Sequence, residues 1–452
     1  MNELVFKAYD IRGKYPEEIN ENVAYTIGKS YGSYLKKYLD KNKCVIGMDN
    51  RLSSKSLKAA LKEGLLDSGM NVIDYGEITT PMHYYTRFIE DTYGIMITAS
   101  HNPKDDNGFK FSFDPVANAR GKMIEEFKDF TFQGNFLEGK GMYETRNIKD
   151  KYLNYLKENI DMGSKKIKVV FDSGNGVTST IIKEAIDLFP NITPIYICDI
   201  SDGTFPNHHP DPAIEENMQM LKEKVLETKA DLGIAFDGDG DRLGIIDENG
   251  KFVMADQYLI VAVRDLISKV KNKTFLCDVK CSKSLIDEIE RLGGKVYMSR
   301  TGTSFTEANT KENNIPLGGE LSGHIFFNDR GPEICSAIYA GLRFIEMLSK
   351  TEKTFSQLLE GTIPYISTPE IKIPCSNETK FQIVEKVAEY VKEKQYSYID
   401  IDGVRINFPN SWVLVRASNT GPNLTLRFEA TTEQELEEKQ KEFAELVESL
   451  IK

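Results

Sequence analysis

Hydrophobic and polar positions follow two different periods along most of the chain, which predicts alternating strands and helices. Short apolar runs at residues 44–49 and 93–97 have the length of buried strands. Between them Leu57, Leu61 and Leu65 recur at helical spacing. The order of strand, helix and strand predicts a largely parallel sheet that is covered by helices on both faces.

The same pattern restarts twice downstream. Further strand-like runs, separated by helical segments, occupy residues 166–176, 194–199 and 230–237, and then 274–280, 295–299 and 315–319. The runs YGIMI (93–97) and LGIAF (232–236) share their spacing, and each precedes an unusual loop. This similarity suggests an internal duplication.

The C-terminal part has a different character. Apolar and polar residues alternate there with period two, and Asp402-Gly403 is a hairpin signal. Helical stretches lie at residues 379–393 and 432–451. We therefore expect an antiparallel sheet with helices in this part.

Composition narrows the function classes. The 452 residues carry a net charge of −12, which argues against a nucleic-acid or anionic-membrane partner. We expect no membrane-spanning segment and no secretory signal, because apolar runs are short and charges fall at positions 3, 7 and 10. The six cysteines are too few for a disulfide scaffold in a chain of this length, so we expect buried thiols and a cytoplasmic location.

Residues 237–242 read DGDGDR, a glycine-rich turn with three aspartates at alternate positions. Asp237, Asp239 and Asp241 can aim their carboxylates at one point, and such hard oxygen ligands suit Mg²⁺. A calcium-binding EF-hand loop fits less well, because Arg242 stands where that loop needs glycine and a strand precedes it. A solvated acidic turn, and a dehalogenase-type phosphatase with Asp237 as nucleophile, stay open alternatives.

The stretch TASHNP (98–103) places Ser100 directly after an apolar strand. The glycines of a hydrolase nucleophile elbow are missing, and a helix N-cap is the plain structural alternative. His101 is the immediate neighbour, and we do not expect its side chain to reach back to Ser100 as a base. Lys104 and Lys110 follow on the same loop and the next strand.

Two further stretches carry polar groups suited to a sugar phosphate. In GGELSGH (318–324), Glu320 and Ser322 can face the same side and read vicinal hydroxyls, and His324 can titrate near neutrality. In RASNTGP (416–422), hydroxyls, backbone N–H groups and a guanidinium can form an anion-binding nest, for which a simple hairpin turn is the alternative. The residues of this second stretch are Arg416, Ser418, Asn419 and Thr420.

In their order along the chain, TASHNP, DGDGDR, GELSGH and RASNTGP resemble the motifs of the α-D-phosphohexomutases. GELSGH most resembles the phosphomannomutase/phosphoglucomutase branch. AYDIRG (8–13), NHHPDP (207–212) and RFEA (427–430) fit the resemblance as well. It implies three similar α/β/α mixed-sheet domains and a C-terminal α+β antiparallel-sheet domain like that of TATA-binding proteins. The domains expected from it are residues 1–148 with the phosphoserine loop, 149–252 with the metal loop, 253–366 with the sugar loop, and 367–452 for phosphate binding.

The resemblance also implies an activity. It is that of an isomerase that interconverts mannose or glucose 1-phosphate and 6-phosphate through a phosphoserine and a hexose 1,6-bisphosphate, which also serves as activator. Ser100 would be the phosphoserine, and one Mg²⁺ per chain would be bound by Ser100, Asp237, Asp239 and Asp241. We expect a monomer or weak homodimer whose partner is a small phosphosugar.

Further roles are carried over onto matching positions. The catalytic residues are expected to be Ser100, Lys110, His324, Arg12 and Arg242, with Lys110 and His324 as acid and base in unassigned order. The expected substrate-binding residues are Lys280, Thr303, Glu320, Ser322, Arg416, Ser418, Asn419 and Thr420. Thr303 stands where bifunctional enzymes often carry histidine, and Leu321 argues against the glucosamine branch. A dehalogenase-type phosphatase using Asp237 and a non-catalytic binding protein are the competing hypotheses.

Overall fold

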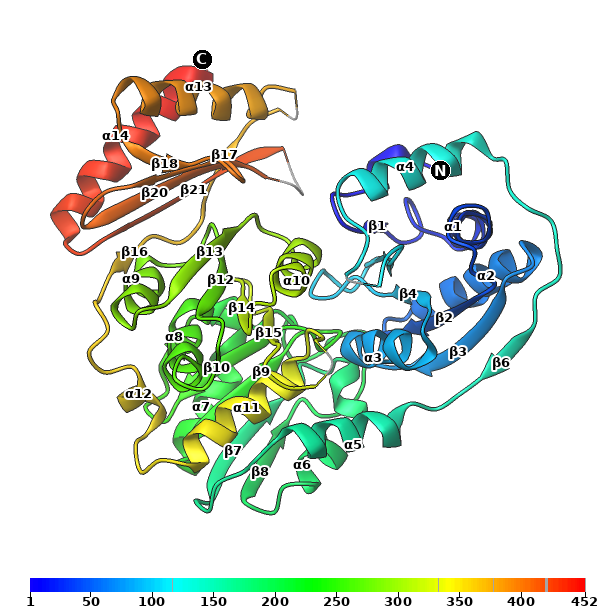
Figure 1. Ribbon diagram of the computed structural model, residues 1–452, viewed down its shortest axis with the longest axis horizontal. Helices are drawn as coiled ribbons and strands as arrows, with labels where there is room; N and C mark the ends of the chain where they lie inside the picture. The colour runs from blue at the N-terminus through cyan, green and yellow to red at the C-terminus, as the bar shows by residue number, and fades with distance from the viewer. Residues whose placement is uncertain (116, 332, 377, 419–421, 452) are drawn as a thin grey trace.

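The computed structural model describes residues 1–115, 117–331, 333–376, 378–418 and 422–451. Three mixed α/β sheets follow one another along the chain, and an antiparallel sheet with helices ends it (Figure 1). The predicted fold class is confirmed. The division at residues 148, 252 and 366 stays a prediction.

The first sheet has the strand order β1-β5-β4-β2-β3-β6. Its strands are β1 (Ile11–Lys14), β2 (Lys43–Met48), β3 (Asn71–Glu77), β4 (Tyr93–Ile97), β5 (Asp106–Phe111) and β6 (Tyr143–Thr145). Its helices are α1 (Glu21–Tyr38), α2 (Ser54–Asp67), α3 (Thr80–Glu90) and α4 (Lys122–Gln133). Side chains fix the helix starts, since Asn20 caps α1 and Thr79 caps α3.

The second and third sheets have the orders β11-β10-β9-β7-β8 and β13-β12-β14-β15. The second part comprises α5 (Lys149–Asn159), β7 (Ile167–Asp172), α6 (Ile182–Asp187), β8 (Ile192–Ile197), α7 (Gln219–Thr228), β9 (Leu232–Phe236), β10 (Leu243–Asp247) and β11 (Phe252–Val253). The third comprises α8 (Ala255–Leu266), β12 (Thr274–Asp278), α9 (Lys283–Arg291), β13 (Lys295–Ser299), α10 (Thr303–Glu312), β14 (Leu317–Gly319), β15 (Ile325–Phe327), α11 (Ala337–Ser349) and α12 (Phe355–Leu358).

The three sheets share one core order. A pair of parallel strands is followed by a third parallel strand, which turns into an antiparallel neighbour: β4 into β5, β9 into β10 and β14 into β15. Each of these turns carries one of the chemistry-bearing stretches, namely residues 98–103, 237–242 and 320–324. Equivalent positions in three similar units therefore supply the three loops, as the similarity between YGIMI and LGIAF suggested.

The fourth domain is an antiparallel sheet with its own helices. Its elements are β16 (Ile366–Ser367), β17 (Ile371–Pro374), α13 (Lys380–Glu393), β18 (Ser397–Ile399), β19 (Val404–Asn407), β20 (Ser411–Ala417), β21 (Asn423–Ala430) and α14 (Glu433–Ile451). The Asp402-Gly403 signal is confirmed, because β18 and β19 pair as a hairpin around it. Figure 1 shows this domain, in orange and red, above the third sheet.

The buried cores show how the domains are joined, and the first domain keeps a core of its own between its sheet and the helices α1, α2 and α4. One continuous buried cluster runs from α3 of the first domain through the second and third domains, and α11 packs on β9 and β10. The fourth domain has a separate core. It meets the third through a small cluster around Trp412 and Val279, and through Arg405, whose Nη1 donates to the carbonyls of Val279 and Cys281 at 2.6 and 2.7 Å. In the part of the chain that the structure describes, no helix is both long and apolar enough to cross a bilayer.

Candidate active site

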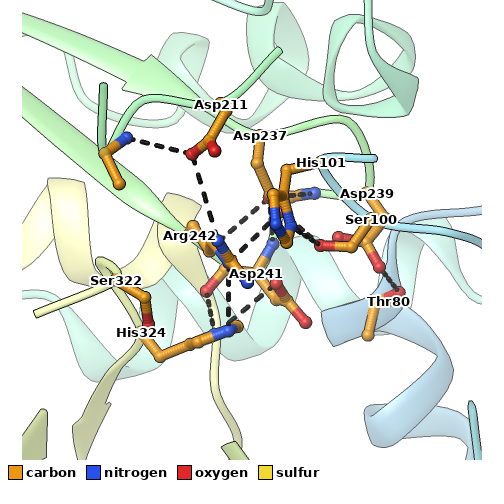
Figure 2. Close-up of polar contacts among 12 residues, drawn as sticks. Thr80, Ser100, His101, Asp211, Asp237, Asp239, Asp241, Arg242, Ser322 and His324 are labelled. Atoms are coloured by element: carbon orange, nitrogen blue, oxygen red, sulfur yellow. Dashed lines mark hydrogen bonds and ion pairs between the residues drawn. The ribbon is translucent and has the colours of Figure 1, made fainter. Parts of the chain in front are cut away.

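Ser100 is held in a tight, buried turn between β4 and β5. Its backbone adopts a positive φ of 53°, which is uncommon for a residue other than glycine, and its N–H donates to Thr98 Oγ1 at 2.8 Å. Arg51 supports the turn by donating to the carbonyls of Ser100 and Asn102 at 2.8 and 2.6 Å. The Ser100 hydroxyl thus points out of the first domain and donates to Asp237 Oδ2 of the second domain at 2.7 Å (Figure 2).

The aspartate turn between β9 and β10 is built around Asp237. Its Oδ1 accepts the backbone N–H groups of Gly240, Asp241 and Arg242 at 3.0, 3.0 and 3.1 Å. Gly240 has a φ of 81°, a conformation that glycine adopts at low cost. The turn brings carboxylate oxygens of Asp237, Asp239 and Asp241 within 4.8 Å of one another, and all three residues are buried.

A buried ammonium balances part of this negative charge. Lys110 Nζ on β5 donates to Asp239 Oδ2 at 2.8 Å and to Asp241 Oδ2 at 2.6 Å. Burial opposes the charge on Lys110, but both carboxylates outweigh burial and raise the pKa of Lys110 well above its usual value. For Asp237, whose Oδ2 lies 3.9 Å from Arg242 Nε, burial and the two neighbouring carboxylates outweigh the nearby cations and raise the pKa well above the ordinary value.

The donor set fits a divalent cation. Within the described residues, Oδ1 of Asp239 and Oδ1 of Asp241 are buried without a hydrogen-bond partner, which is costly unless something else contacts them. Three carboxylates and a serine hydroxyl are hard oxygen donors of the kind that Mg²⁺ prefers. These residues can therefore hold the ion that the sequence predicted.

His101 lies closer to Ser100 than the sequence suggested. The ring does reach back, because Nδ1 lies 3.3 Å from Ser100 Oγ, but the Ser100 hydroxyl donates to Asp237, so the expectation that His101 is not the base stays a prediction. The positive φ at Ser100 turns the chain so that neighbouring side chains converge. Burial and then the cations Arg242 and Arg12 lower the pKa of His101 well below its usual value, so the ring is neutral.

His324 is also held neutral. Its Nδ1 donates to the Asp241 carbonyl at 3.2 Å, and its Nε2 accepts from Arg242 Nε at 3.2 Å (Figure 2). Burial and the nearby Arg242 lower the pKa of His324 well below its usual value. In this arrangement Nε2 becomes available to take a proton only when Arg242 moves away.

The stretch predicted to bind the sugar lines the same cavity as Ser100. Glu320 Oε1 accepts from Thr306 Oγ1 at 2.6 Å and from Gly302 N at 3.2 Å, while Oε2 accepts from Ser322 Oγ at 3.1 Å. Burial and then the Asp278 carboxylate raise the pKa of Glu320 to about 7, against the hydrogen bonds from Thr306 and Ser322. The carboxylate is thus fixed in orientation and poised to titrate near neutrality.

The fourth domain contributes Arg416. Its Nη2 donates to Asp402 Oδ2 at 3.0 Å, and the same oxygen accepts the N–H of Thr301 in the third domain at 3.0 Å. Nε of Arg416 is buried and has no partner among the described residues. Lys280 Nζ lies 3.1 Å from Glu370 Oε1 nearby. Of the predicted nest, Ser418 is buried, while Asn419 and Thr420 lie outside the described residues.

One cavity of about 530 Å³ brings residues of all four domains together. The predicted residues that line it are Arg12, Ser100, Lys110, Arg242, Lys280, Thr303, Glu320, Ser322, His324, Arg416 and Ser418. The aspartate turn lies buried beneath Ser100 and Lys110. The sequence analysis missed Tyr9, which lines the cavity from within AYDIRG, and His101. It also missed Asp402, whose only local signal was that of a hairpin.

The chain matches models of a known family along nearly its whole length. Phosphoglucomutase/phosphomannomutase α/β/α domains I, II and III match residues 3–136, 150–250 and 254–365. The C-terminal domain of that family matches residues 370–446.

Individual relatives agree with these matches. A phosphomannomutase/phosphoglucomutase of Pseudomonas aeruginosa is 39% identical over 438 residues, covering 96% of this chain and 93% of its own length. A phosphoglucomutase of Neisseria meningitidis is 35% identical over 452 residues, covering 98% of this chain and 97% of its own. The crystal structure of a phosphoglucomutase/phosphomannomutase family protein from Burkholderia thailandensis matches with a TM-score of 0.92 and 33% identity, over 100% of this chain and 98% of that chain.

Proposed function

This chain belongs to the phosphoglucomutase/phosphomannomutase family, and from that premise we propose that its hexose phosphate mutase activity runs through a phosphorylated Ser100. As a member of the family it is an isomerase of hexose phosphates. The observation that carries the proposal is the 2.7 Å contact between the Ser100 hydroxyl and a carboxylate of the aspartate turn. This contact sets the proposed phosphoryl carrier against a cluster of carboxylates that can hold a cation.

The proposed substrates are mannose 1-phosphate and glucose 1-phosphate. The relatives include a phosphomannomutase/phosphoglucomutase and a phosphoglucomutase, which supports both sugars. Leu321, between the sugar-reading Glu320 and Ser322, argues against glucosamine phosphate. Thr303 leaves the preference between the two hexoses to measurement. A cytoplasmic location and a monomeric or weakly dimeric state stay predictions.

In the proposed first step, phospho-Ser100 gives its phosphoryl group to the free hydroxyl of the hexose phosphate. The O–P bond to serine breaks, the new bond to the sugar oxygen forms, and the hydroxyl proton leaves to a base. The bisphosphate then turns within the cavity and returns the phosphoryl group of carbon 1 to Ser100. Such transfer is mainly positioning and charge neutralisation, which suits a buried, pre-arranged site.

The chain's own residues divide this work by their placement. Lys110 and Arg12 supply positive charge beside Ser100, and the raised pKa of Lys110 keeps it protonated and able to donate rather than to accept. His324 is the neutral candidate for the base once Arg242 releases its Nε2. Arg416 and Ser418 would hold the phosphate that is not reacting, and Glu320 and Ser322 would bind ring hydroxyls in either orientation.

Mg²⁺ is the proposed cofactor, held by Asp237, Asp239, Asp241 and an oxygen of Ser100. When bound it would withdraw charge from the phosphorylated serine. The bisphosphate is proposed as the activator that phosphorylates Ser100. The phosphatase alternative has no support in the family assignment, since the relatives are named as mutases.

The proposal is tested by assaying mannose, glucose and glucosamine 1-phosphates side by side, with Mg²⁺ and bisphosphate present. We expect turnover of the first two sugars and phosphate mapped to the peptide that contains Ser100. Phosphate found on Asp237 instead, with release of inorganic phosphate, would favour the phosphatase.

The raised pKa of Glu320 predicts a pH dependence. Sugar hydroxyls donate to the ionised carboxylate, so kcat/KM should fall about tenfold per pH unit as pH drops below about 7. The substrate phosphate, with a second pKa of about 6, also titrates in this range and adds its own slope to the pH profile of kcat/KM. A Glu320→Gln variant keeps the pH dependence that comes from the substrate but loses the part that comes from the carboxylate. The ratio of kcat/KM in wild type to kcat/KM in the variant, plotted against pH, therefore isolates Glu320. An unchanged ratio between pH 5.5 and 8.5 would contradict this role.

The raised pKa of Glu320 also determines how the free energy of unfolding changes with pH. The folded protein binds the Glu320 proton more tightly than the unfolded chain does, so the stability cost of ionised Glu320 grows between pH 4.5 and about pH 7, is complete above about pH 7 and is absent below pH 4.5. Glu320→Gln should therefore melt higher than wild type at pH 8.5, with the difference shrinking at pH 5.5.

Arg416→Ala should raise KM by about tenfold or more, because the proposed charge-assisted contact to the substrate phosphate is lost. The affinity for Mg²⁺ should change little, because Arg416 lies in the fourth domain and the aspartate turn lies in the second. Steady-state kinetics and a Mg²⁺ titration provide the measurement. Lys392→Ala, on the exposed side of α13, is the control and should behave as wild type. An unchanged KM for Arg416→Ala would remove this residue from the phosphate site.

A further inference from the structure

A second group of metal-ligating side chains lies in the second domain, apart from the aspartate turn. Asp172 ends β7, Cys198 follows β8, and His208 lies in the loop beyond, and their ligand atoms all lie within 4.8 Å of one another. His208 Nε2 is 3.1 Å from Asp172 Oδ2 and 3.2 Å from Oδ1. The proposed phosphoryl transfer uses none of the three residues.

The imidazole of His208 is oriented so that Nε2 faces the other two side chains of the group, as the nitrogen of a metal ligand would. Its Nδ1 lies 3.0 Å from the carbonyl of His209, and a carbonyl can only accept, so Nδ1 carries a proton. In the neutral ring the lone pair is then on Nε2, aimed at the Asp172 carboxylate. Two acceptors face each other at 3.1 Å only if a proton or a metal ion lies between them.

A proton is the competing occupant. Burial opposes a charge on His208, but hydrogen bonds to the Asp172 carboxylate and the Cys198 thiol raise the pKa of the ring to about 10. The same carboxylate, thiol and imidazole are the ligand types of zinc sites. Zinc would replace the imidazolium proton and the thiol proton, releasing both to solvent.

Cys198 is held in a conformation that local propensity does not explain. Its φ of 48° lies in the left-handed region, which a residue other than glycine adopts at some cost. The side chain is 9% exposed, and His208 is half-buried, so an ion can reach the group and keep a water as fourth ligand. A tetrahedral ion at bond lengths of about 2.0–2.3 Å needs its ligands about 3.5 Å apart, which small side-chain shifts provide.

The position in the fold is that of a ligand site. β7 and β8 correspond to β12 and β13 of the third domain by strand order. At the carboxyl end of those strands, Asp278 Oδ2 accepts from Thr301 Oγ1 at 3.3 Å beside the substrate cavity. Ligands bind at this edge of open α/β sheets. In the second domain the equivalent edge carries the same carboxylate, Asp172, together with a thiol and an imidazole.

We propose that Asp172, Cys198 and His208 form a zinc-binding site distinct from the magnesium site. Its loop after β7 contacts the aspartate turn, because Val177 N donates to the carbonyl of Gly238 at 3.0 Å, and it contacts the first domain, because Asn50 Nδ2 donates to the carbonyl of Asn175 at 2.8 Å. Zinc bound to residues on either side of these contacts stiffens the support of the aspartate turn.

The test uses the full-length protein, freed of metal and saturated with Mg²⁺, and titrates it with Zn²⁺ or Co²⁺ alone. We expect wild type to bind one equivalent of zinc that Cys198→Ser binds about a hundredfold more weakly or not at all. Co²⁺ should give a thiolate charge-transfer absorption in wild type that is missing from Cys198→Ser. Zinc should raise the melting temperature of wild type by more than that of the variant.

Cys375→Ser is the matched control, since Cys375 is also 9% exposed but belongs to no such group among the described residues. It should bind zinc as wild type does. Cys335 is another buried thiol near an imidazole, since its Sγ lies 3.6 Å from His324 Nδ1. A cobalt–thiolate band that survives in Cys198→Ser and is lost in Cys335→Ser would place the cobalt at His324 and overturn the proposal. Equal zinc affinity in wild type and Cys198→Ser would overturn it too, leaving His208 and Asp172 as a structural ion pair.

Discussion

Replacing Ser100 with alanine is expected to lower the rate of hexose phosphate isomerisation by about a thousandfold or more, because a covalent carrier cannot be replaced by positioning alone. The hydroxyl lost is the one that donates to Asp237 at 2.7 Å, whereas the Thr98 hydroxyl of the same loop donates to Asp239 at 3.1 Å and stays in the variant. The coupled assay with bisphosphate gives the rate, and intact mass gives the phosphate content. Both should be near zero for the variant.

The control for this substitution is another buried serine of the same domain. Ser112 has a hydroxyl without a partner among the described residues, so Ser112→Ala should keep both activity and phosphorylation. Ser100→Ala should melt within a few degrees of wild type, since one hydrogen bond contributes only about 1 kcal/mol. Turnover of Ser100→Ala near that of Ser112→Ala would refute the phosphoserine mechanism.

Asp237→Asn is expected to abolish activity while stabilising the metal-free protein. The amide keeps an oxygen for the three backbone N–H groups that Oδ1 now accepts, and it offers an N–H toward Ser100. It also removes one of three buried carboxylates that repel one another, a repulsion expressed in the raised pKa of Asp237. We expect a melting temperature about 2 °C or more above wild type in chelator, and a loss of at least about a hundredfold in turnover.

Added Mg²⁺ should reverse the order of stability. Wild type gains stability from the ion, whereas the variant has lost a ligand and gains little. Asp247→Asn, at the far end of β10, serves as the activity control because its carboxylate caps a turn away from the cavity. If Asp237→Asn melts lower than wild type in chelator, the three carboxylates do not repel as described. If it also stays active, the cation site lies elsewhere.

The sequence predicted those parts of the site whose contacts are formed by residues close together along the chain. The aspartate turn was predictable because three ligands and two glycines lie within six residues, and the strand before it is a plain apolar run. The hairpin at Asp402-Gly403 was predictable for the same reason. Order along the chain then identified the family, and with it the fold.

Contacts between distant segments were not predictable. The residues around Asp402 give no sign that its carboxylate binds both Arg416 and the N–H of Thr301. Thr301 lies in the third domain, whereas Asp402 and Arg416 lie in the fourth. Arg51 donates to carbonyls of the serine turn from a position about fifty residues earlier, with no motif around it. The position of the His101 ring was not predicted because it depends on the unusual φ of Ser100, which sequence spacing does not reveal.

The hydrogen bond that joins residue 100 to residue 237 also has a consequence for biosynthesis. A nascent chain that has released only its first domain from the ribosome carries Ser100, the proposed phosphoryl acceptor, but not the Asp237 carboxylate that Ser100 contacts in the folded protein. We therefore expect activity to begin only after the second domain has emerged and docked on the first. Chains that terminate before the second domain should be inactive rather than partly active. Two separately expressed fragments divided between those domains would regain turnover only by reassociating.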